Sequence, residues 1–146
     1  MKLISNEASF LGRGWSFPVA FSHDHSMTLM VKEEEDIWQC LHILLSTTPG
    51  ERLMHSDFGC NLRRMLFEPL SNSLVNIMEN NIYKSITKFE PRISLNKVTI
   101  TEEPNSQQTG IVFIKLEYTI RSTNSRSNLV FPFYKAEGTN IIEQHR

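Results

Sequence analysis

The chain has 146 residues, of which 40% are hydrophobic and 21% charged, and its formal net charge is −1. This length and composition are typical of one globular domain with its own core, and they exclude a disordered chain or two large domains. The near-zero charge argues against a protein that works mainly through phosphate contacts, so we expect no nucleic-acid partner.

The charge is divided unevenly along the chain. Residues 1–60 hold 4 Lys and Arg against 8 Asp and Glu, whereas residues 61–146 hold 11 against 8. Such an uneven charge distribution favours a protein that docks onto different neighbours through opposite faces.

Membrane and secretory signals are missing from the pattern. No stretch approaches the roughly 20 apolar residues of a membrane span, and residues 1–7 have no apolar signal-peptide region. The two cysteines, Cys40 and Cys60, are too few for a disulfide framework. We therefore expect reduced thiols, with Cys40 in the core, in a cytoplasmic protein that does not insert into membranes.

The N-terminal 22 residues predict an extended arm, because Gly and Pro interrupt any helix there. Its aromatic side chains must be buried on the body or on a partner; they are Phe10, Trp15, Phe17 and Phe21. Residues 27–32 alternate with period two and predict a short strand. The four acids at 33–36 suit the first turn of an amphipathic helix, which Thr48-Pro49-Gly50 ends.

The middle of the chain predicts a loop and two further helices. Residues 51–60 form the loop, and residues 61–67 form a short helix that Pro69 stops. Ser71 or Ser73 can cap a long amphipathic helix that ends at Glu90-Pro91.

The remainder predicts an antiparallel β-sheet. A strand over 93–100 contains a bulge, and residues 103–110 form a turn. Residues 111–121 form the longest strand, with one apolar face made by Val112, Ile114, Leu116, Tyr118 and Ile120. After a polar turn over 122–128, residues 129–134 form a last strand that Pro132 confines to a sheet edge.

These elements predict an α+β fold, with an N-terminal extended arm and helices packed on a C-terminal antiparallel β-sheet. The expected boundaries are an arm over 1–22, a single domain over 23–137 and a tail over 138–146.

Histidines offer little evidence of a site. His23-Asp24-His25 could supply two metal ligands, but no third ligand is near in sequence, so a solvated turn is the better interpretation. His42 lies beside the apolar stripe of its helix and is better interpreted as structural than as a base. We expect no metal and no cofactor.

Paired carboxylates could carry glycoside hydrolysis, which needs one protonated acid and a second carboxylate about 5–9 Å away. The candidates are Glu51, Asp57, Glu68 and Glu90. Glu51 and Glu90 have neighbouring arginines, which favour the ionised form and oppose a general-acid role. We therefore predict no catalytic residue.

Several segments together resemble the lysozyme-like baseplate-wedge family of contractile phage tails, type VI secretion systems (the TssE proteins) and related injection machines. They are residues 11–18 (LGRGWSFP), 45–54 (LSTTPGERLM), 57–59 (DFG), 66–69 (LFEP) and 90–92 (EPR). The family motif residues are Pro49, Gly50, Glu51, Arg52, Phe58 and Gly59. The resemblance covers residues 10–135, and His55-Ser56-Asp57 departs from the usual Pro-Glu type pair.

The resemblance implies a structural baseplate part that docks on wedge proteins and starts sheath assembly. Glu90, Pro91 and Arg92 are then the expected contact to the wedge helical bundle. The rigid Pro91 would let both charged side chains project; an exposed ion pair at a helix end is the alternative.

The same resemblance implies that C-terminal strands template strands of sheath subunits by strand addition. The expected contacts are Leu129, Val130, Phe131, Phe133 and Tyr134, although a hairpin satisfied within the fold is equally compatible with the pattern. Hub, spike or tube proteins are further candidate partners. Two other functions stay open: a peptidoglycan-cleaving lysozyme, and a small adaptor that binds a regulator.

Overall fold

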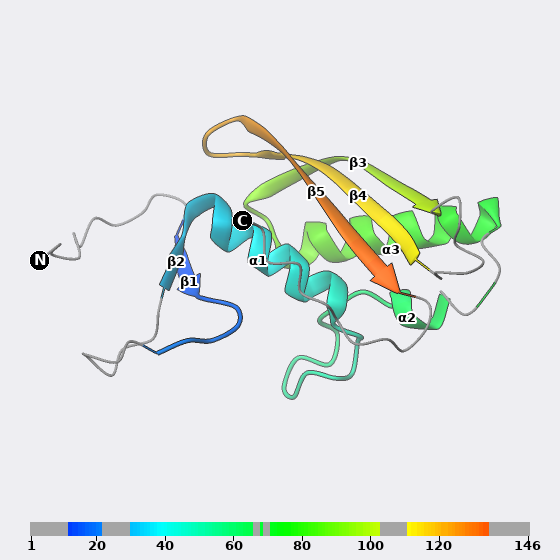
Figure 1. Cartoon of the computed structure of the whole chain (residues 1–146), viewed down its shortest axis with the longest axis horizontal. Helices are drawn as coiled ribbons and strands as arrows, with labels where there is room; N and C mark the ends of the chain where they lie inside the picture. Colours follow the sequence, from blue (N-terminus) through cyan, green and yellow to red (C-terminus); the bar gives the residue numbers. More distant parts are fainter. Residues whose placement is uncertain (1–11, 22–29, 66–67, 69–70, 103–110, 135–146) are drawn as a thin grey trace, which may run out of the picture.

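The structure, a computed structural model, describes residues 12–21, 30–65, 68, 71–102 and 111–134. Two strands and three helices come first, followed by three long strands (Figure 1). The elements are β1 (Arg13–Trp15), β2 (Met30–Lys32), α1 (Glu33–Ser46), α2 (Leu62–Met65), α3 (Asn72–Phe89), β3 (Ile93–Glu102), β4 (Ile111–Ile120) and β5 (Ser125–Tyr134). The fold is α+β, as the sequence predicted.

The C-terminal sheet is antiparallel in the order β3-β4-β5, with α3 running along it and α1 beside α3 (Figure 1). The alternate residues predicted for one face of β4 are all buried. They meet the apolar stripes of α1 and α3, which include Ile37, Leu41, Met78 and Ile82. This contact between a period-two face and helical stripes builds the core.

The long helix begins and ends where the sequence predicted. Ser71 is its N-cap, and its hydroxyl oxygen accepts a hydrogen bond from Leu74 N at 3.2 Å. At the other end the N–H of Glu90 donates to Ile86 O at 2.8 Å. Pro91 then follows, and the chain turns into β3.

The strands also test several predictions. The β-bulge is confirmed, because the β3–β4 register shifts between Leu95 and Lys97. Pro132 is confirmed on an edge strand, since β5 ends the sheet order. The prediction that residues 111–121 form the longest strand is wrong, because β3, β4 and β5 have 10 residues each.

The predicted polar turn over 122–128 is too long, because β5 already begins at Ser125. Its polar residues Ser125 to Asn128 pair with Ile120 to Glu117 of β4. Backbone pairing to an adjacent strand therefore overrides their weak strand propensity. The turn itself contains Asn124 with a φ of 53°, a value that asparagine tolerates well.

The described part of the arm is extended and pairs with β2 through β1. Phe17 N donates to Gln39 Oε1 at 2.8 Å, which ties the arm to α1. The aromatic rings nevertheless stay outside: Trp15 is 64% exposed and Phe21 is 69% exposed. Burial of these two rings on the body is therefore wrong, whereas Phe10 lies outside the described residues.

The two thiols lie in different environments. Cys60 is buried in the core, whereas Cys40 is half-buried beside polar groups, so the prediction of a core position for Cys40 is wrong. Of the predicted strand over 27–32, the structure describes Met30–Lys32. The 103–110 turn and the C-terminal tail lie outside the described residues. No helix within the described ranges is long and apolar enough to cross a membrane.

Candidate functional site

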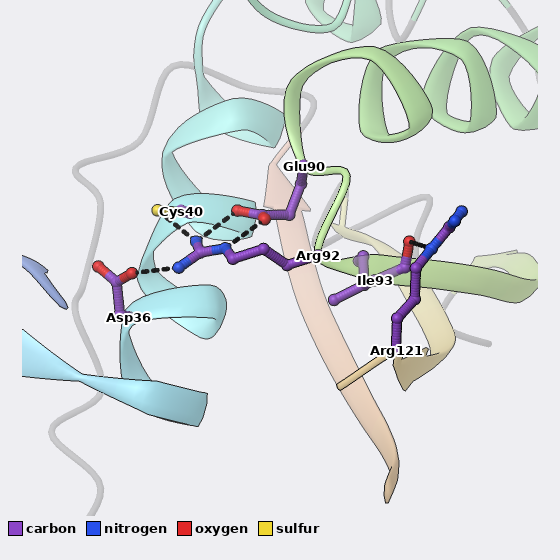
Figure 2. Close-up of polar contacts among 6 residues, drawn as sticks. All are labelled: Asp36, Cys40, Glu90, Arg92, Ile93 and Arg121. Atoms are coloured by element: carbon purple, nitrogen blue, oxygen red, sulfur yellow. Dashed lines mark hydrogen bonds and ion pairs between the residues drawn. The ribbon is translucent and has the colours of Figure 1, made fainter. Parts of the chain in front are cut away.

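One guanidinium joins the end of α3 to α1 (Figure 2). Arg92 donates from Nε to Glu90 Oε1 at 2.6 Å and from Nη2 to Glu90 Oε2 at 2.7 Å. Its Nη1 donates to Asp36 Oδ2 at 2.6 Å. We call these three residues the Arg92 cluster; Cys40 Sγ lies 3.6 Å from Arg92 Nη2. A bidentate pair plus a second carboxylate is among the strongest charge-assisted arrangements.

The Arg92 cluster is mostly withdrawn from solvent. Glu90 is 5% exposed and Asp36 is 6% exposed. Hydrogen bonding to Glu90, opposed by burial and reinforced by Asp36, raises the pKa of Arg92. Burial, and then the charges of Asp36 and Glu90, raise the pKa of the neighbouring Cys40 thiol. The low local dielectric strengthens such pairs and makes any unpaired member costly.

The backbone beneath the Arg92 cluster is fixed from the sheet. Arg121 N donates to Arg92 O at 3.0 Å, and Arg121 Nε donates to Ile93 O at 3.1 Å (Figure 2). The chain therefore leaves α3 with a defined direction. This holds the guanidinium against α1.

The expectation that both charged side chains of the E-P-R segment project outward is wrong. Glu90 is buried, and Arg92 turns inward to pair with it and with Asp36. The reason is electrostatic, because two buried carboxylates need a cation between them. Of the segment, Pro91 is exposed, and the Arg92 side chain is 29% exposed.

Sequence reasoning missed Asp36 as the third member. It was interpreted only as one of four acids that favour the start of α1. No local signal pairs Asp36 with Arg92, although Asp36 and Cys40, four residues apart, share one face of α1.

A pocket of about 430 Å³ lies beside the Arg92 cluster. Its lining includes Glu90, Cys40, Phe89, Phe58 and Arg52. The pocket therefore joins the E-P-R segment to the P-G-E-R and F-G segments, which are far apart in sequence. A concave, largely apolar surface with a few polar groups is typical of a recognition site.

The family motif residues build the loop that closes this pocket. Gly59 has a φ of +117°, and a Cβ there would lie 2.3 Å from Thr47 O, so only glycine fits. Cys60 N donates to the same Thr47 O at 2.9 Å. The Arg52 guanidinium lies 4.6 Å from the centre of the Phe58 ring, a cation–π arrangement that leaves Glu51 to other partners.

Three of the four candidate carboxylates are paired with cations, which favours their ionised form, although Glu51 and Glu90 line the same pocket. Both oxygens of Glu90 accept from Arg92. Glu51 accepts from Thr48 N at 2.9 Å and lies 3.8 Å from Arg63. Asp57 pairs with Lys88, whose hydrogen bond lowers the pKa of Asp57. Glu68 is exposed, and no described contact brings it to the others.

Metal ligation has no support in the described residues. They contain no group of three or more His, Cys, Asp and Glu side chains that could hold an ion. The His23-Asp24-His25 segment lies outside them. His42 has the structural environment predicted for it, because its ring stacks on Trp38 at 5.5 Å and meets Phe131 edge-on at 4.9 Å.

The predicted sheath-contact strand presents two different faces. Leu129 and Phe131 point into the core, with 3% and 6% exposure. Val130 and Tyr134 face outward, with 52% and 37% exposure, and Phe133 is half-buried. Of the five predicted contact residues, only Val130 and Tyr134 are therefore exposed to solvent, while an edge strand offers backbone hydrogen-bonding groups.

These features define a small α+β protein in which a buried charged cluster joins the end of α3 to α1 beside a concave pocket. The sequence pattern of the baseplate wedge protein gp25 family matches residues 31–125, and the chain belongs to this family. Baseplate protein W of Escherichia phage P2 is 31% identical over 81 residues, which cover 56% of this chain and 70% of that protein. Baseplate wedge protein gp25 of Enterobacteria phage T4 is 32% identical over 57 residues, 39% of this chain and 43% of that one.

Solved structures agree with the fold. A protein described as a tail lysozyme from Geobacter sulfurreducens is 39% identical, with a TM-score of 0.66 over 75% of this chain and 98% of that chain. A chain in the baseplate of the anti-feeding prophage is 26% identical, with a TM-score of 0.62 over 86% of this chain and 87% of that one. A chain of the postcontracted pyocin R2 baseplate, 19% identical with a TM-score of 0.50, covers 81% and 99% and shares the fold.

Proposed function

We propose that this protein is a non-enzymatic structural component in the baseplate of a contractile injection machine, either a phage tail or a TssE-like part of a type VI secretion system. It docks on wedge proteins and initiates the sheath, and it is assembled in the cytoplasm. Residues 23–137 serve as the baseplate-wedge domain, with residues 1–22 as its arm and 138–146 as its tail. Family membership and the baseplates that contain similar chains support this role.

The observation that carries the proposal is the pocket beside the Arg92 cluster. Because Glu90 is buried, the wedge helical bundle contacts the exposed Pro91 and the outer part of Arg92 rather than a projecting acid. The pocket accepts a large apolar side chain of the bundle. An anchor in a pocket with a charged group at its margin is the arrangement that dominates many interfaces.

Pro91→Glu tests this contact without removing a member of the Arg92 cluster. The new charge lies on the proposed interface, so affinity for the purified wedge proteins should fall roughly tenfold or more in calorimetric titration. Ser122→Glu, at an exposed turn, is the matched control and should bind like the wild type. Equal affinity of all three proteins, with equal melting temperatures, would contradict the docking site.

The outer edge of β5 is the proposed template for a sheath strand. Pro132 has no N–H and cannot donate to a neighbouring strand. It therefore fits a position of β5 at which the backbone N–H would point away from β4. Residues two apart in a strand face the same neighbour, so Val130 also offers its N–H outward. Val130→Pro should therefore block strand addition while sparing the β4 ladder. Sheaths of normal length on baseplates carrying this variant, measured by electron microscopy, would argue against the edge.

The non-enzymatic part of the proposal has its own test. The purified protein should leave a peptidoglycan suspension turbid. If the protein clears the suspension, and a single carboxylate-to-amide substitution abolishes this clearing, the protein is an enzyme and the non-enzymatic proposal is wrong.

A further inference from the structure

The loop over residues 51–57 carries two apolar side chains that are almost fully exposed. Leu53 is 91% exposed and Met54 is 98% exposed. The next most exposed large apolar side chain in the described part of the chain is Phe21, at 69%. Isolated exposed apolar residues are ordinary, but two adjacent side chains held almost entirely in water mark a contact surface.

Local backbone preference does not explain why Leu53 and Met54 occupy the tip of this loop. Met54 has a φ of 67°, in the left-handed region where glycine and asparagine are favoured. The tip of a connecting loop ordinarily carries small or polar residues that make its turn. A sequence that opposes its own local geometry is expected where function requires the side chain.

The loop is held firmly at its base. Glu51 N donates to Thr48 O at 3.1 Å, and Phe58 N donates to His55 O at 3.1 Å. The Phe58 ring packs edge-on against Phe89 at 5.0 Å. Figure 1 shows the segment projecting from the body between α1 and α2. A loop whose base is fixed in this way loses less backbone entropy on binding, so the binding cost at its tip comes mainly from ordering the two side chains.

The base of the loop brings together three cations and two carboxylates, an excess of one positive charge. Arg63 pairs with Glu51 at 3.8 Å, and Lys88 pairs with Asp57. Arg52, over the Phe58 ring, is a further cation at this base. A surface that binds here therefore gains from acidic side chains around an apolar centre.

We propose that Leu53 and Met54 form an apolar knob that inserts into an apolar socket, rimmed by acidic side chains, on a wedge protein. This inference rests on the proposed function and adds a second contact to the one at Pro91 and the pocket. A protein socket fits better than a lipid surface, because membrane binding needs a broad apolar face and these are two side chains on a fixed tip. Methionine suits such a contact, since its flexible thioether fills irregular cavities.

The test compares two double variants in titrations with the purified wedge proteins. Leu53→Ser/Met54→Ser should raise the Kd roughly tenfold or more, because the knob is lost. Ile77→Ser/Tyr83→Ser changes two exposed apolar residues on α3 and should leave the Kd within about twofold. Melting temperatures of the knob variant and the wild type should agree, since neither side chain is buried.

Each outcome has a distinct meaning. An unchanged Kd for the knob variant overturns the knob, while a loss caused by Pro91→Glu would still support wedge docking. If the wild-type chain does not bind the wedge proteins, the proposed function fails and the knob falls with it. Flotation of the wild type, but not of the knob variant, with vesicles of phosphatidylethanolamine and phosphatidylglycerol would replace the protein socket with a membrane.

Discussion

Glu90 of the Arg92 cluster and the base of the loop over residues 51–57 line the same pocket, but the Arg92 cluster and the tip of that loop distribute their side chains in opposite ways. At the Arg92 cluster, charged groups lie inside, with Glu90 only 5% exposed. At the loop tip, apolar groups lie outside, with Met54 98% exposed. Both arrangements oppose the ordinary preference of charged groups for water and of apolar groups for the interior.

The comparison separates two physical roles, one in folding and one in the proposed binding. The buried charges hold α1 against the end of α3, so their main contribution is to the stability and shape of the pocket. The exposed apolar tip contributes nothing to folding that its burial could explain, so its contribution is expected in binding. Changes at the first region should therefore affect unfolding, and changes at the second should affect association.

The largest expected effect is that of Arg92→Ala. It leaves Asp36 and Glu90 as buried, unpaired carboxylates, so the free energy of unfolding should fall by about 3–5 kcal/mol. Urea denaturation measures the loss. Replacing all three members with apolar residues of similar size should restore most of it, because no buried charge then remains uncompensated.

The matched control is an exposed ion pair. Lys115→Ala breaks the Lys115–Glu117 pair, whose atoms lie 3.3 Å apart near the surface, and should cost under about 1 kcal/mol. If Arg92→Ala costs no more than this control, the cluster does not join the helices.

A smaller loss is expected from Gly59→Ala at the base of the loop. The new Cβ would meet the backbone oxygen of Thr47 at 2.3 Å, and the φ of +117° disfavours any side chain. The expected cost is about 2–3 kcal/mol of unfolding free energy. Gly50→Ala is the control, since its φ of +96° is similarly unfavourable but its Cβ meets nothing within 4 Å; it should cost about 1 kcal/mol. Equal melting temperatures for the two variants would show that the contact with Thr47 is not tight.

The sequence predicted the elements whose signals are local. The α3 boundaries followed from Ser71 and from Glu90-Pro91, and the buried face of β4 followed from period-two alternation. The start of β5 did not, because Ser125 to Asn128 depend on backbone pairing with β4 rather than on their own propensity.

The candidate site depends even more on distant residues. Arg92 turns inward because of Asp36, which lies 56 positions away in sequence. No local pattern identifies that partner, so the E-P-R segment was assigned to the surface. The exposure of Leu53 and Met54 was equally hidden, because an apolar pair in a loop is more often covered by the body.

The smallest expected effect concerns His42, which lies on the same helix as Asp36 but is surrounded by rings rather than by an ion pair. Burial lowers the pKa of His42 below its ordinary value of 6.5. The unfolded chain therefore binds a proton there more readily than the folded protein does. The stability that the neutral ring confers is therefore fully present above about pH 6.5, the ordinary pKa of histidine, and is lost as the pH falls below it.

His42→Phe keeps an aromatic ring between Trp38 and Phe131 and removes the titrating group. Urea midpoints measured at about pH 7.5 and about pH 5.5 should therefore fall more for the wild type than for the variant. Equal falls would mean that acid sensitivity in this range comes from other groups. Because the Arg92 cluster is intact in both proteins, the difference isolates the ring-lined face of α1 from its ion-paired face.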